Sequence, residues 1–401
     1  MSDQKFAYVI AGGGLAGASA VEGIRELDKN GTVLLVGSEV DPPYDRPPLT
    51  KKLWFGKKKV EEIFVHDRNY YEQNNVTLAL GRTLVSVDVE SRTVKDDRGQ
   101  KYGYEKLLLA TGGIPRRLPV PGGDLEGICY YRYLSDYLQI RGEAKEGKSA
   151  IVIGGGFIGS EIAAALNTNK IIVTMVFPEP YLCSRVFPAA LGKAINSLYL
   201  ERGVTLLAGE RPVSIVREQE KFKLRTEKGG DIAADMMIAG LGIEPNTALG
   251  AKAGLSAGDG LVVNEFLETS HPGVYAAGDL ALFPYLALGQ RVRVEHWDNA
   301  VTQGKWAGRN MAGARAPYTH MPYFYSDLFE FGYEAVGDVD ARLPTFTDWK
   351  KINDTGVIYY LKDGQVRGAM MCNVWEKVDA ARALILKAET RPPEGWRGAI
   401  G

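Results

Sequence analysis

The sequence contains few cysteines, and their spacing pairs none of them. Cys129, Cys183 and Cys372 are far apart, and no C-x-x-C or C-x4-C pattern is present. Closely spaced cysteines are what a redox-active dithiol or a local zinc site requires. The sequence therefore encodes neither, so we expect buried or idle thiols and no metal site.

The chain also lacks an excess of charge of either sign. Its 48 basic and 49 acidic residues give a formal net charge of -1. Such a protein has no summed field that would hold it on nucleic acid or on an anionic membrane, so we expect neither as a partner. Residues 1–6 lead into the first apolar segment with no long apolar run and no cleavage site before it. This pattern makes a cytoplasmic protein the expectation.

What the chain does have is an internal repeat. With 401 residues, of which 45% are apolar, it can bury a sizeable core over two or three domains. The segment AYVIAGGG at residues 7–14 recurs as AIVIGGG at residues 150–156. Each copy is followed by a helix-favouring stretch (residues 18–27 and 160–166) and another apolar run (residues 33–36 and 171–176). The pattern predicts two βαβ units.

Buried strands that end in glycine turns, at residues 107–115 and 236–242, indicate where the second unit interrupts the first. From residue 321 aromatic strands begin, and the Asp-Gly pair at residues 363–364 is typical of a hairpin. We expect an α/β protein with two Rossmann-like dinucleotide-binding domains and a small α+β C-terminal domain. The expected limits are residues 1–128 with 246–320, residues 129–245, and residues 321–401, with a loose tail from residue 389.

The two glycine-rich turns predict two bound nucleotides. In G-x-G-x-x-G the first glycine permits the tight turn, the second lets the backbone approach the pyrophosphate, and the third lets helix pack on strand. Two matches in βαβ context favour this reading over plain strand-to-helix turns. The expected cofactor-binding residues are Gly12, Gly14, Leu15, Ala16 and Gly17 in the first turn, and Gly154, Gly156, Phe157, Ile158 and Gly159 in the second.

Acidic residues near strand ends suggest which nucleotide each unit binds. Glu39 ends the second strand of the first unit, where a carboxylate can accept hydrogen bonds from ribose, although a solvated loop charge is the alternative. In the second unit the strand ends at Phe177 and the first carboxylate is Glu179, which favours NADH over NADPH.

Asp279 follows another apolar run, at a position that suits a ribityl chain, although it could instead cap a helix. Together with the turn of Ala110, Thr111 and Gly112, it predicts a flavin reductase. FAD is then expected in the first unit and the pyridine nucleotide in the second.

Further segments resemble known families. Residues 43–51 (PYDRPPLTK) resemble the FAD/NADH reductases that serve ferredoxins of oxygenase systems, and equally apoptosis-inducing factor. Both belong to the glutathione-reductase-like superfamily. The resemblance to apoptosis-inducing factor is closer at residues 154–161, 177–179, 293–296, 325–328 and 332–337.

The resemblance implies roles for individual residues. It places Arg46 and Lys51 along the flavin, with Lys51 paired to Glu161 near the reactive N5, and these two are the expected catalytic residues. Considered alone, Lys51 could be a surface lysine, and Glu161 could complement the helix dipole from the first turn. The resemblance also implies flavin-side contacts by Val85, Arg132, Glu295, His296, Trp297 and Ala300, and nicotinamide-nucleotide contacts by Phe157, Glu179, Gly242, Glu295 and His296.

Three departures from the family pattern matter. Trp297 stands where apoptosis-inducing factor has a histidine and the ferredoxin reductases a tryptophan. Tyr325 replaces a tryptophan of both relatives, which puts nicotinamide stacking there in doubt. Residues 348–357 lack the long insertion of animal apoptosis-inducing factor, which argues against DNA binding.

The expected reaction is hydride transfer from nicotinamide C4 to flavin N5, followed by direct electron transfer to a ferredoxin- or rubredoxin-like carrier. Lys51, Lys52, Lys57, Lys58 and Lys59 could dock such a carrier, although a lysine run is usually a solvated face. The alternative is a redox-sensing protein like apoptosis-inducing factor, with slow NADH oxidation and an NADH-linked change of oligomer, such as a homodimer, or of partner. A peroxide-forming NADH oxidase is a third hypothesis.

Overall fold

The computed structural model describes residues 4–401, which divide into two compact units. The first unit takes the chain up to Asp45, then Val60–Ile114 and Glu244–Pro322. The second takes Arg46–Lys59, Pro115–Ile243 and Tyr323–Gly401. The C-terminal residues and the short segment after Asp45 are thus grouped with the second unit, whereas we expected a separate C-terminal domain. The predicted domain limits themselves stay a prediction.

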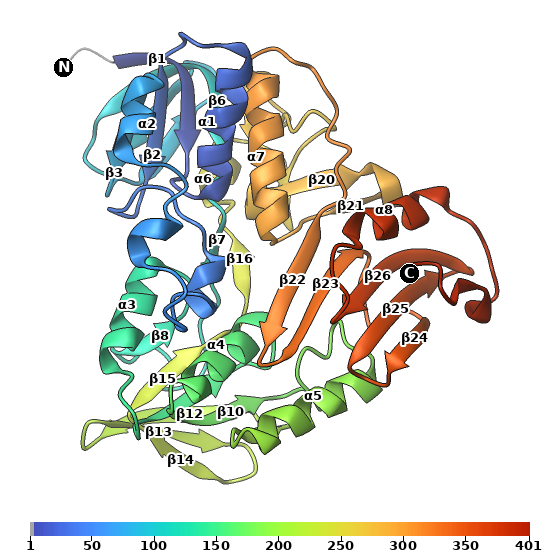
Figure 1. The fold of residues 1–401 in the computed structure, drawn as a ribbon. Helices are drawn as coiled ribbons and strands as arrows, with labels where there is room; N and C mark the ends of the chain where they lie inside the picture. The colour runs from blue at the N-terminus through green and yellow to red at the C-terminus, as the bar shows by residue number, and fades with distance from the viewer. Residues whose placement is uncertain (1–3) are drawn as a thin grey trace. The chain divides into compact units, whose positions relative to one another are not determined.

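The first unit is built on a mostly parallel sheet, whose labelled strands β1, β2, β3 and β6 are drawn in shades of blue in Figure 1. Its order is β3 (Val76–Leu80), β2 (Val33–Gly37), β1 (Gln4–Ala11) and β6 (Lys101–Leu109), with β19 (Val274–Ala276) parallel to β6. All of β2 and the carboxyl-terminal ends of β1 and β6 are buried and apolar, because parallel strands are covered on both faces there. β5 (Thr93–Asp96) and β4 (Leu84–Asp88) extend the sheet as antiparallel strands.

Helices α1 (Leu15–Leu27) and α7 (Trp297–Met311) of the first unit lie side by side (Figure 1). Glycines make the close approach possible, since a Cβ on Gly304 would overlap with the carbonyl oxygen of Ala16, and one on Gly308 with that of Ala20. This contact fixes the start of α1, where the first glycine turn lies. The other elements of this unit are α2 (Arg68–Gln73), α6 (Ala248–Lys252), β17 (Ala257–Gly258), β18 (Gly260–Val262), β20 (Ala281–Tyr285) and β21 (Gln290–Val292), with short helices η2 (Val60–Ile63), η3 (Gly278–Leu280) and η4 (Leu286–Leu288).

The second unit repeats the parallel arrangement. Its sheet has the order β11 (Thr205–Ala208), β10 (Ile172–Phe177), β9 (Ser149–Ile153), β15 (Met236–Ala239) and β8 (Ile128–Tyr130). Helix α4 (Phe157–Thr168) connects β9 to β10, as α1 connects β1 to β2, so both predicted βαβ units are present. This unit also contains η1 (Pro47–Thr50), α3 (Leu134–Glu143), α5 (Ala189–Glu201) and the antiparallel strands β12 (Pro212–Glu218), β13 (Lys221–Thr226) and β14 (Asp231–Ala234). β7 (Gly113–Pro115) and β16 (Ile243–Pro245) fall where the chain passes between the units.

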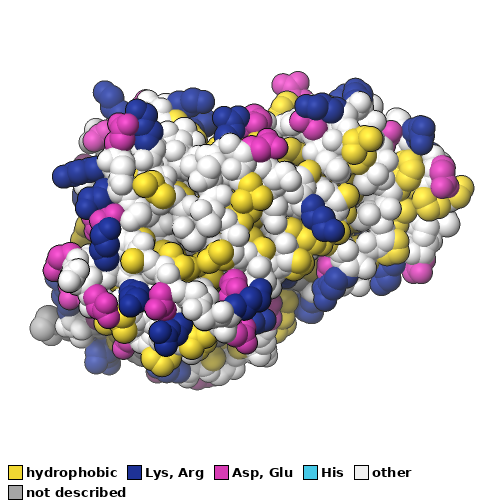
Figure 2. Space-filling model, turned by 90° about the horizontal axis from the view of Figure 1, so that it is seen from below, with side chains coloured by type: hydrophobic (Ala, Val, Ile, Leu, Met, Phe, Trp, Pro, Cys, Tyr) yellow, Lys and Arg dark blue, Asp and Glu magenta, His cyan; other side chains and the backbone are white. Residues whose placement is uncertain are grey.

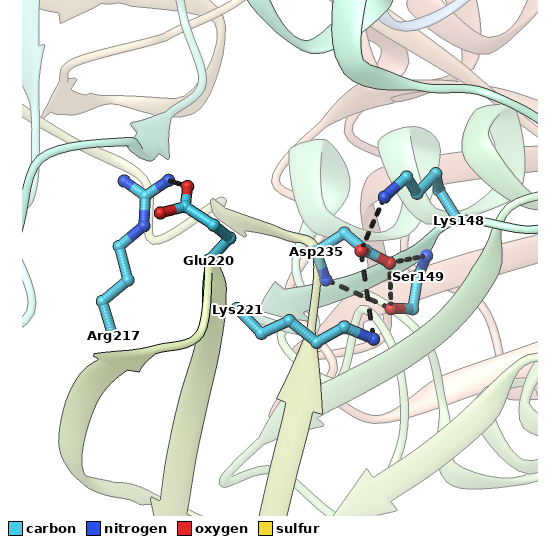
Figure 3. A network of polar contacts seen from close by, with 6 residues as sticks. All are labelled: Lys148, Ser149, Arg217, Glu220, Lys221 and Asp235. Atoms are coloured by element: carbon cyan, nitrogen blue, oxygen red, sulfur yellow. Dashed lines mark hydrogen bonds and ion pairs between the residues drawn. The ribbon is translucent and has the colours of Figure 1, made fainter.

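A polar network holds the connection between β14 and β15 against the start of β9 (Figure 3). The carboxylate of Asp235 accepts hydrogen bonds from the hydroxyl of Ser149 at 2.7 Å and from its backbone N–H at 2.9 Å. Lys148 Nζ lies 2.9 Å from the same carboxylate. The pKa of Asp235 is strongly lowered, chiefly by the hydrogen bond from the Ser149 hydroxyl and further by the Ser149 backbone N–H and Lys148. This carboxylate therefore stays ionised.

The C-terminal residues of the second unit form an antiparallel sheet with α8 (Val378–Lys387) packed on it. Its order is β22 (Tyr323–Leu328), β23 (Phe331–Gly337), β26 (Gln365–Cys372), β25 (Thr355–Lys362) and β24 (Thr345–Lys351). The predicted hairpin joins β25 to β26, and Asp363 and Gly364 both have positive φ, as a type I′ turn requires. The α/β fold with two Rossmann-like domains and a C-terminal α+β part is therefore confirmed.

The prediction of a loose tail from residue 389 is wrong. Trp396, in the short helix η5 (Pro393–Trp396), is fully buried, and Ile400 is buried as well. The backbone N–H of Ile400 donates to the hydroxyl of Tyr359 at 3.0 Å. The prolines and glycines of this segment thus form turns that direct an aromatic side chain inward.

All three cysteines are free and buried, as expected, and burial raises the pKa of Cys183 to about 12. Within residues 4–401 no helix is both long and apolar enough to cross a membrane, and no group of three or more His, Cys, Asp or Glu side chains could hold a metal ion. On the face shown in Figure 2, basic and acidic side chains are interspersed, in keeping with the small net charge.

Candidate functional site

The first glycine turn has the geometry of a pyrophosphate cradle. Gly12 has φ 136°, and a Cβ there would overlap with the carbonyl oxygen of Ala110, while one on Gly17 would overlap with that of Gly12. A Cβ on Gly14 would meet nothing within 4 Å. Gly14 is the N-cap of α1, and no side chain of residues 4–401 caps this helix end. The start of α1 therefore has open space at Gly14 and no side-chain cap, as a bound dinucleotide phosphate requires.

A buried amide lies beside this turn. Gln303 on α7 is fully buried, and its Oε1 accepts a hydrogen bond from the backbone N–H of Gly278 at 2.9 Å. Within residues 4–401 its Nε2 has no hydrogen-bond partner. Gly278 lies against Ala16 of the glycine turn and precedes Asp279. An unpaired buried donor beside a helix N-terminus suits the oxygen-rich middle of a dinucleotide, so the residues present fit FAD.

Other flavin-side residues of the first unit are held by neighbours. The carboxylate of Glu39 accepts a hydrogen bond from the hydroxyl of Tyr44 at 2.5 Å, so it is not simply a solvated loop charge. The hydroxyl of Thr111 donates to the carbonyl of Asn246 at 2.9 Å. The carboxylate of Glu295 lies 2.6 Å from Arg293.

Two aromatic residues begin helix α7. Trp297 Nε1 donates to the carboxylate of Asp45 at 2.8 Å, and the indole remains partly exposed. His296 is the N-cap residue, and burial lowers the pKa of its imidazole to about 4, while the nearby Asp279 and Asp298 oppose this shift. The imidazole is therefore neutral at neutral pH.

The second glycine turn repeats the geometry of the first. A Cβ on Gly154 would overlap with the carbonyl of Gly240, one on Gly159 with that of Gly154, and one on Gly156 would meet nothing within 4 Å. No side chain of residues 4–401 caps α4 at Gly156. The ring of Phe177 packs against Gly155, which explains the aromatic residue at this strand end. This turn fits the second dinucleotide.

A buried charged cluster lies one turn inside α4. Lys51 Nζ and Glu161 Oε1 are 2.5 Å apart, and both side chains are buried. The hydroxyl of Ser326 donates to Oε1 at 2.6 Å, and that of Thr50 donates to Oε2 at 2.5 Å. The structure thus brings the two expected catalytic residues together.

The dipole explanation for Glu161 is wrong. Helix α4 begins at Phe157, so Glu161 is its fifth residue, and its first turn contains no acidic residue. The helix starts directly at the glycines, three residues earlier than the helix-favouring stretch indicated. The carboxylate is stabilised by its three donors and not by the helix end.

An aromatic ring of the second unit lies beside the ammonium group of Lys51. Lys51 Nζ lies 5.3 Å from the ring centre of Tyr325, and the rings of Phe157 and Phe324 are 5.4 Å apart. Arg46 donates to the backbone carbonyl of Arg132 at 2.8 Å. The tyrosine that replaces the family's tryptophan thus contacts the ammonium group of Lys51.

For the remaining residues that were expected to contact a cofactor, the structure gives the location, and the contacts themselves stay predictions. Val85 is exposed on β4, Ala300 is half-buried on α7, Ile158 is partly exposed on α4, Glu179 is half-buried after β10, and Gly242 follows β15 with positive φ.

Sequence reasoning missed Thr50, Ser326 and Gln303. The available signal was a polar residue at a position that its neighbours indicate to be buried. Ser326 follows three aromatic residues in its strand, and Gln303 precedes Gly304 on the face of α7 that packs on α1.

Comparison with known proteins agrees with this geometry. Residues 6–304 match the family described as pyridine nucleotide-disulphide oxidoreductase, and residues 307–355 match the C-terminal region described as apoptosis-inducing factor, mitochondrion-associated. Apoptosis-inducing factor 1, mitochondrial, of Dictyostelium discoideum is 34% identical over 96% of this chain and 79% of its own length. Rubredoxin-NAD(+) reductase of Pseudomonas putida is 34% identical over 82% of this chain and 86% of its own.

Among solved structures, the reductase in the covalent putidaredoxin reductase–putidaredoxin complex superposes with a TM-score of 0.91 and 28% identity, over 98% of this chain and 95% of that one. The resemblance inferred from the motifs is confirmed, as are FAD and NAD(H) as cofactors. The chain belongs to the pyridine nucleotide-disulphide oxidoreductase family and is an NADH-dependent flavoprotein of that family.

Proposed function

We propose that this protein passes electrons from NADH to a small, acidic iron–sulfur or rubredoxin-type carrier. The observation that carries the proposal is the segment of residues 51–59, here called the basic loop, which begins at the buried Lys51 and exposes Lys52, Lys57 and Lys59. Positive charges on one short loop favour docking of an acidic partner.

The basic loop also offers an apolar contact. Phe55 is 42% exposed, and Lys57 Nζ lies 6.0 Å from its ring centre. Transient partners commonly bind through an aromatic residue surrounded by polar and charged side chains. This combination supports a docking role over a purely solvated face.

The residues of the chain bind and orient, while bound FAD and NADH supply the hydride and electron transfer. The two glycine turns present backbone donors to the pyrophosphates. Lys51 supplies a buried positive charge that its partner Glu161 holds in place. No side chain needs to exchange a proton, and with no cysteine pair in the sequence, no dithiol has to relay the electrons.

We also propose that NADH is preferred over NADPH. Glu179 follows β10 and is half-buried, and Gly209 N–H binds its backbone carbonyl at 3.1 Å. A carboxylate at this position accepts hydrogen bonds from ribose hydroxyls and repels a 2′-phosphate.

The test is steady-state reduction of a [2Fe–2S] ferredoxin and of a rubredoxin, with ferricyanide as a small reference acceptor. Lys57→Glu should lower kcat/KM for the carrier by about three- to tenfold, and rising salt should lower the wild-type value. Ferricyanide reduction should be unaffected. Lys362→Glu, at the exposed end of β25 beside the hairpin turn, is the matched control. Equal rates for the two charge reversals would refute docking at the basic loop.

A second candidate rests on the match of residues 307–355 to the C-terminal region of apoptosis-inducing factor. In this case NADH is oxidised slowly, and reduction changes a homodimer or a partner surface. Gel filtration with and without NADH separates the two candidates. A sensor changes its mass on reduction and turns over carriers slowly, whereas a reductase keeps its mass and turns them over rapidly.

A further inference from the structure

We infer that Thr50 and Ser326 are positioning residues that clamp the Glu161 carboxylate and thereby hold the Lys51 ammonium group at one point. This inference rests on the proposed NADH-dependent reduction of the flavin. The two hydroxyls and Lys51 come from two segments that are distant in sequence from Glu161 and from each other. Thr50 ends η1 and Lys51 follows it directly, whereas Ser326 lies on β22.

All four side chains are removed from water. The exposed fractions are 4% for Thr50, 8% for Lys51, 6% for Glu161 and 1% for Ser326. A buried carboxylate is costly unless its oxygens are hydrogen-bonded and its charge is balanced. Here Oε1 receives Lys51 and Ser326, and Oε2 receives Thr50, so both oxygens are occupied.

The division of donors between the two oxygens fixes the orientation of the carboxylate. An ionised carboxylate only accepts hydrogen bonds, so each hydroxyl must be a donor. Thr50 holds Oε2, and rotation of the carboxylate plane would break this bond. Oε1 is therefore kept toward Lys51.

Thr50 acts on Lys51 in a second way, because the two residues are adjacent. Thr50 ends η1, and the backbone N–H of Lys51 donates to the carbonyl of Pro48 at 3.1 Å. Anchoring the Thr50 side chain on α4 thus anchors the backbone from which Lys51 extends. On its other side the Lys51 ammonium meets the Tyr325 ring at 5.3 Å.

Ser326 brings the C-terminal sheet into this arrangement. It lies on β22 opposite Tyr333 of β23, and the adjacent residue of the strand is Tyr325. One strand therefore supplies both the hydroxyl that orients Glu161 and the ring that Lys51 faces. A fixed charge assists a reaction more than a mobile one, since no reorganisation is needed when charge develops.

The inference predicts that the two hydroxyls affect the rate of flavin reduction only through their hydrogen bonds to Glu161. Thr50→Val keeps the shape of the side chain and removes the donor. It should lower the stopped-flow rate constant of flavin reduction by NADH about three- to tenfold, which is the effect of one hydrogen bond to a charged group. Thr50→Ser should restore most of that loss, and Ser326→Ala should resemble Thr50→Val.

A double-mutant cycle gives the decisive comparison. In a Glu161→Gln background, Thr50→Val should change the rate constant less than about twofold, because the charge that Thr50 holds is gone. The reduction potential of the bound flavin should shift in Thr50→Val relative to the Thr50→Ser protein. Thr168→Val, which removes a hydroxyl bonded to the carbonyl of Ala164 at the other end of α4, is the matched control.

Equal losses for Thr50→Val in the wild-type and Glu161→Gln backgrounds would overturn the inference. A Thr50→Ser protein as slow as Thr50→Val would overturn it too. If Thr50→Val does not fold with its flavin, the same cycle is run with Ser326→Cys and Ser326→Ala. The assay contains only NADH, so failure to reduce a ferredoxin would contradict the proposed function and leave this result untouched.

Discussion

The side-chain oxygen of Gln303 accepts a hydrogen bond from the backbone N–H of Gly278 at 2.9 Å, and the nitrogen of the same amide has no partner within residues 4–401. The amide is fully buried beside the first glycine turn. A buried donor without a partner is expensive to keep, so it indicates a bound group that completes it.

We expect Gln303→Met to weaken FAD binding about tenfold. The substitution preserves the volume, removes the free donor and leaves the Gly278 N–H without its acceptor, which is worth about 1–3 kcal/mol. Fluorescence quenching on adding FAD to apoprotein measures the Kd. Gln139→Met, at an exposed position on α3, is the control. An unchanged Kd would show that the amide does not face the flavin.

Lys51→Ala should slow reduction of the flavin by NADH at least about tenfold, because it removes a buried positive charge and leaves Glu161 unbalanced. Stopped-flow absorbance at the flavin band follows the step. Lys145→Ala, at an exposed site after α3, should reduce at the wild-type rate. An unchanged rate constant for Lys51→Ala would remove this lysine from the site.

Glu179→Arg should raise kcat/KM for NADPH about tenfold and lower that for NADH. The arginine replaces a repulsive charge with one that binds the 2′-phosphate. Initial rates with both nucleotides give the ratio. A ratio that does not move would place the ribose away from Glu179.

The low pKa of His296 predicts that the protein loses stability in mild acid. Its folded-state pKa is lowered to about 4 by burial, below the unfolded value of about 6.5, so protonation favours the unfolded chain. The stabilisation is present above pH 6.5 and decreases as the pH falls from about 6.5 to about 4, by roughly 3 kcal/mol. The midpoint of chemical denaturation, measured at each pH, should change less over this range in His296→Gln than in the wild-type protein. Parallel profiles for the two proteins would contradict the shift.

The features that sequence predicted correctly are those with local causes. The glycine turns follow from steric demands within a few residues, because a Cβ on Gly17 would overlap with the carbonyl oxygen of Gly12, and one on Gly159 with that of Gly154. The hairpin at Asp363 follows from its own positive φ. In each case neighbouring residues determine the local conformation, so a sequence pattern is enough to predict it.

The features that were missed depend on distant contacts. Thr50 and Ser326 have no local pattern and become meaningful only because Glu161 is brought between them. Trp396 looked part of a loose tail because its neighbours are turn formers, yet the C-terminal sheet buries it completely. Tertiary packing overrode the composition of that segment.

The three isolated, buried thiols limit how many electrons each chain can hold. Family members with a dithiol store one electron pair on sulfur and another on flavin, whereas here Cys129, Cys183 and Cys372 have no partner of their kind. A reductive titration should therefore end at one NADH per chain. One hydride equivalent reduces each chain fully, and the chain must pass on these electrons before it can oxidise a second NADH.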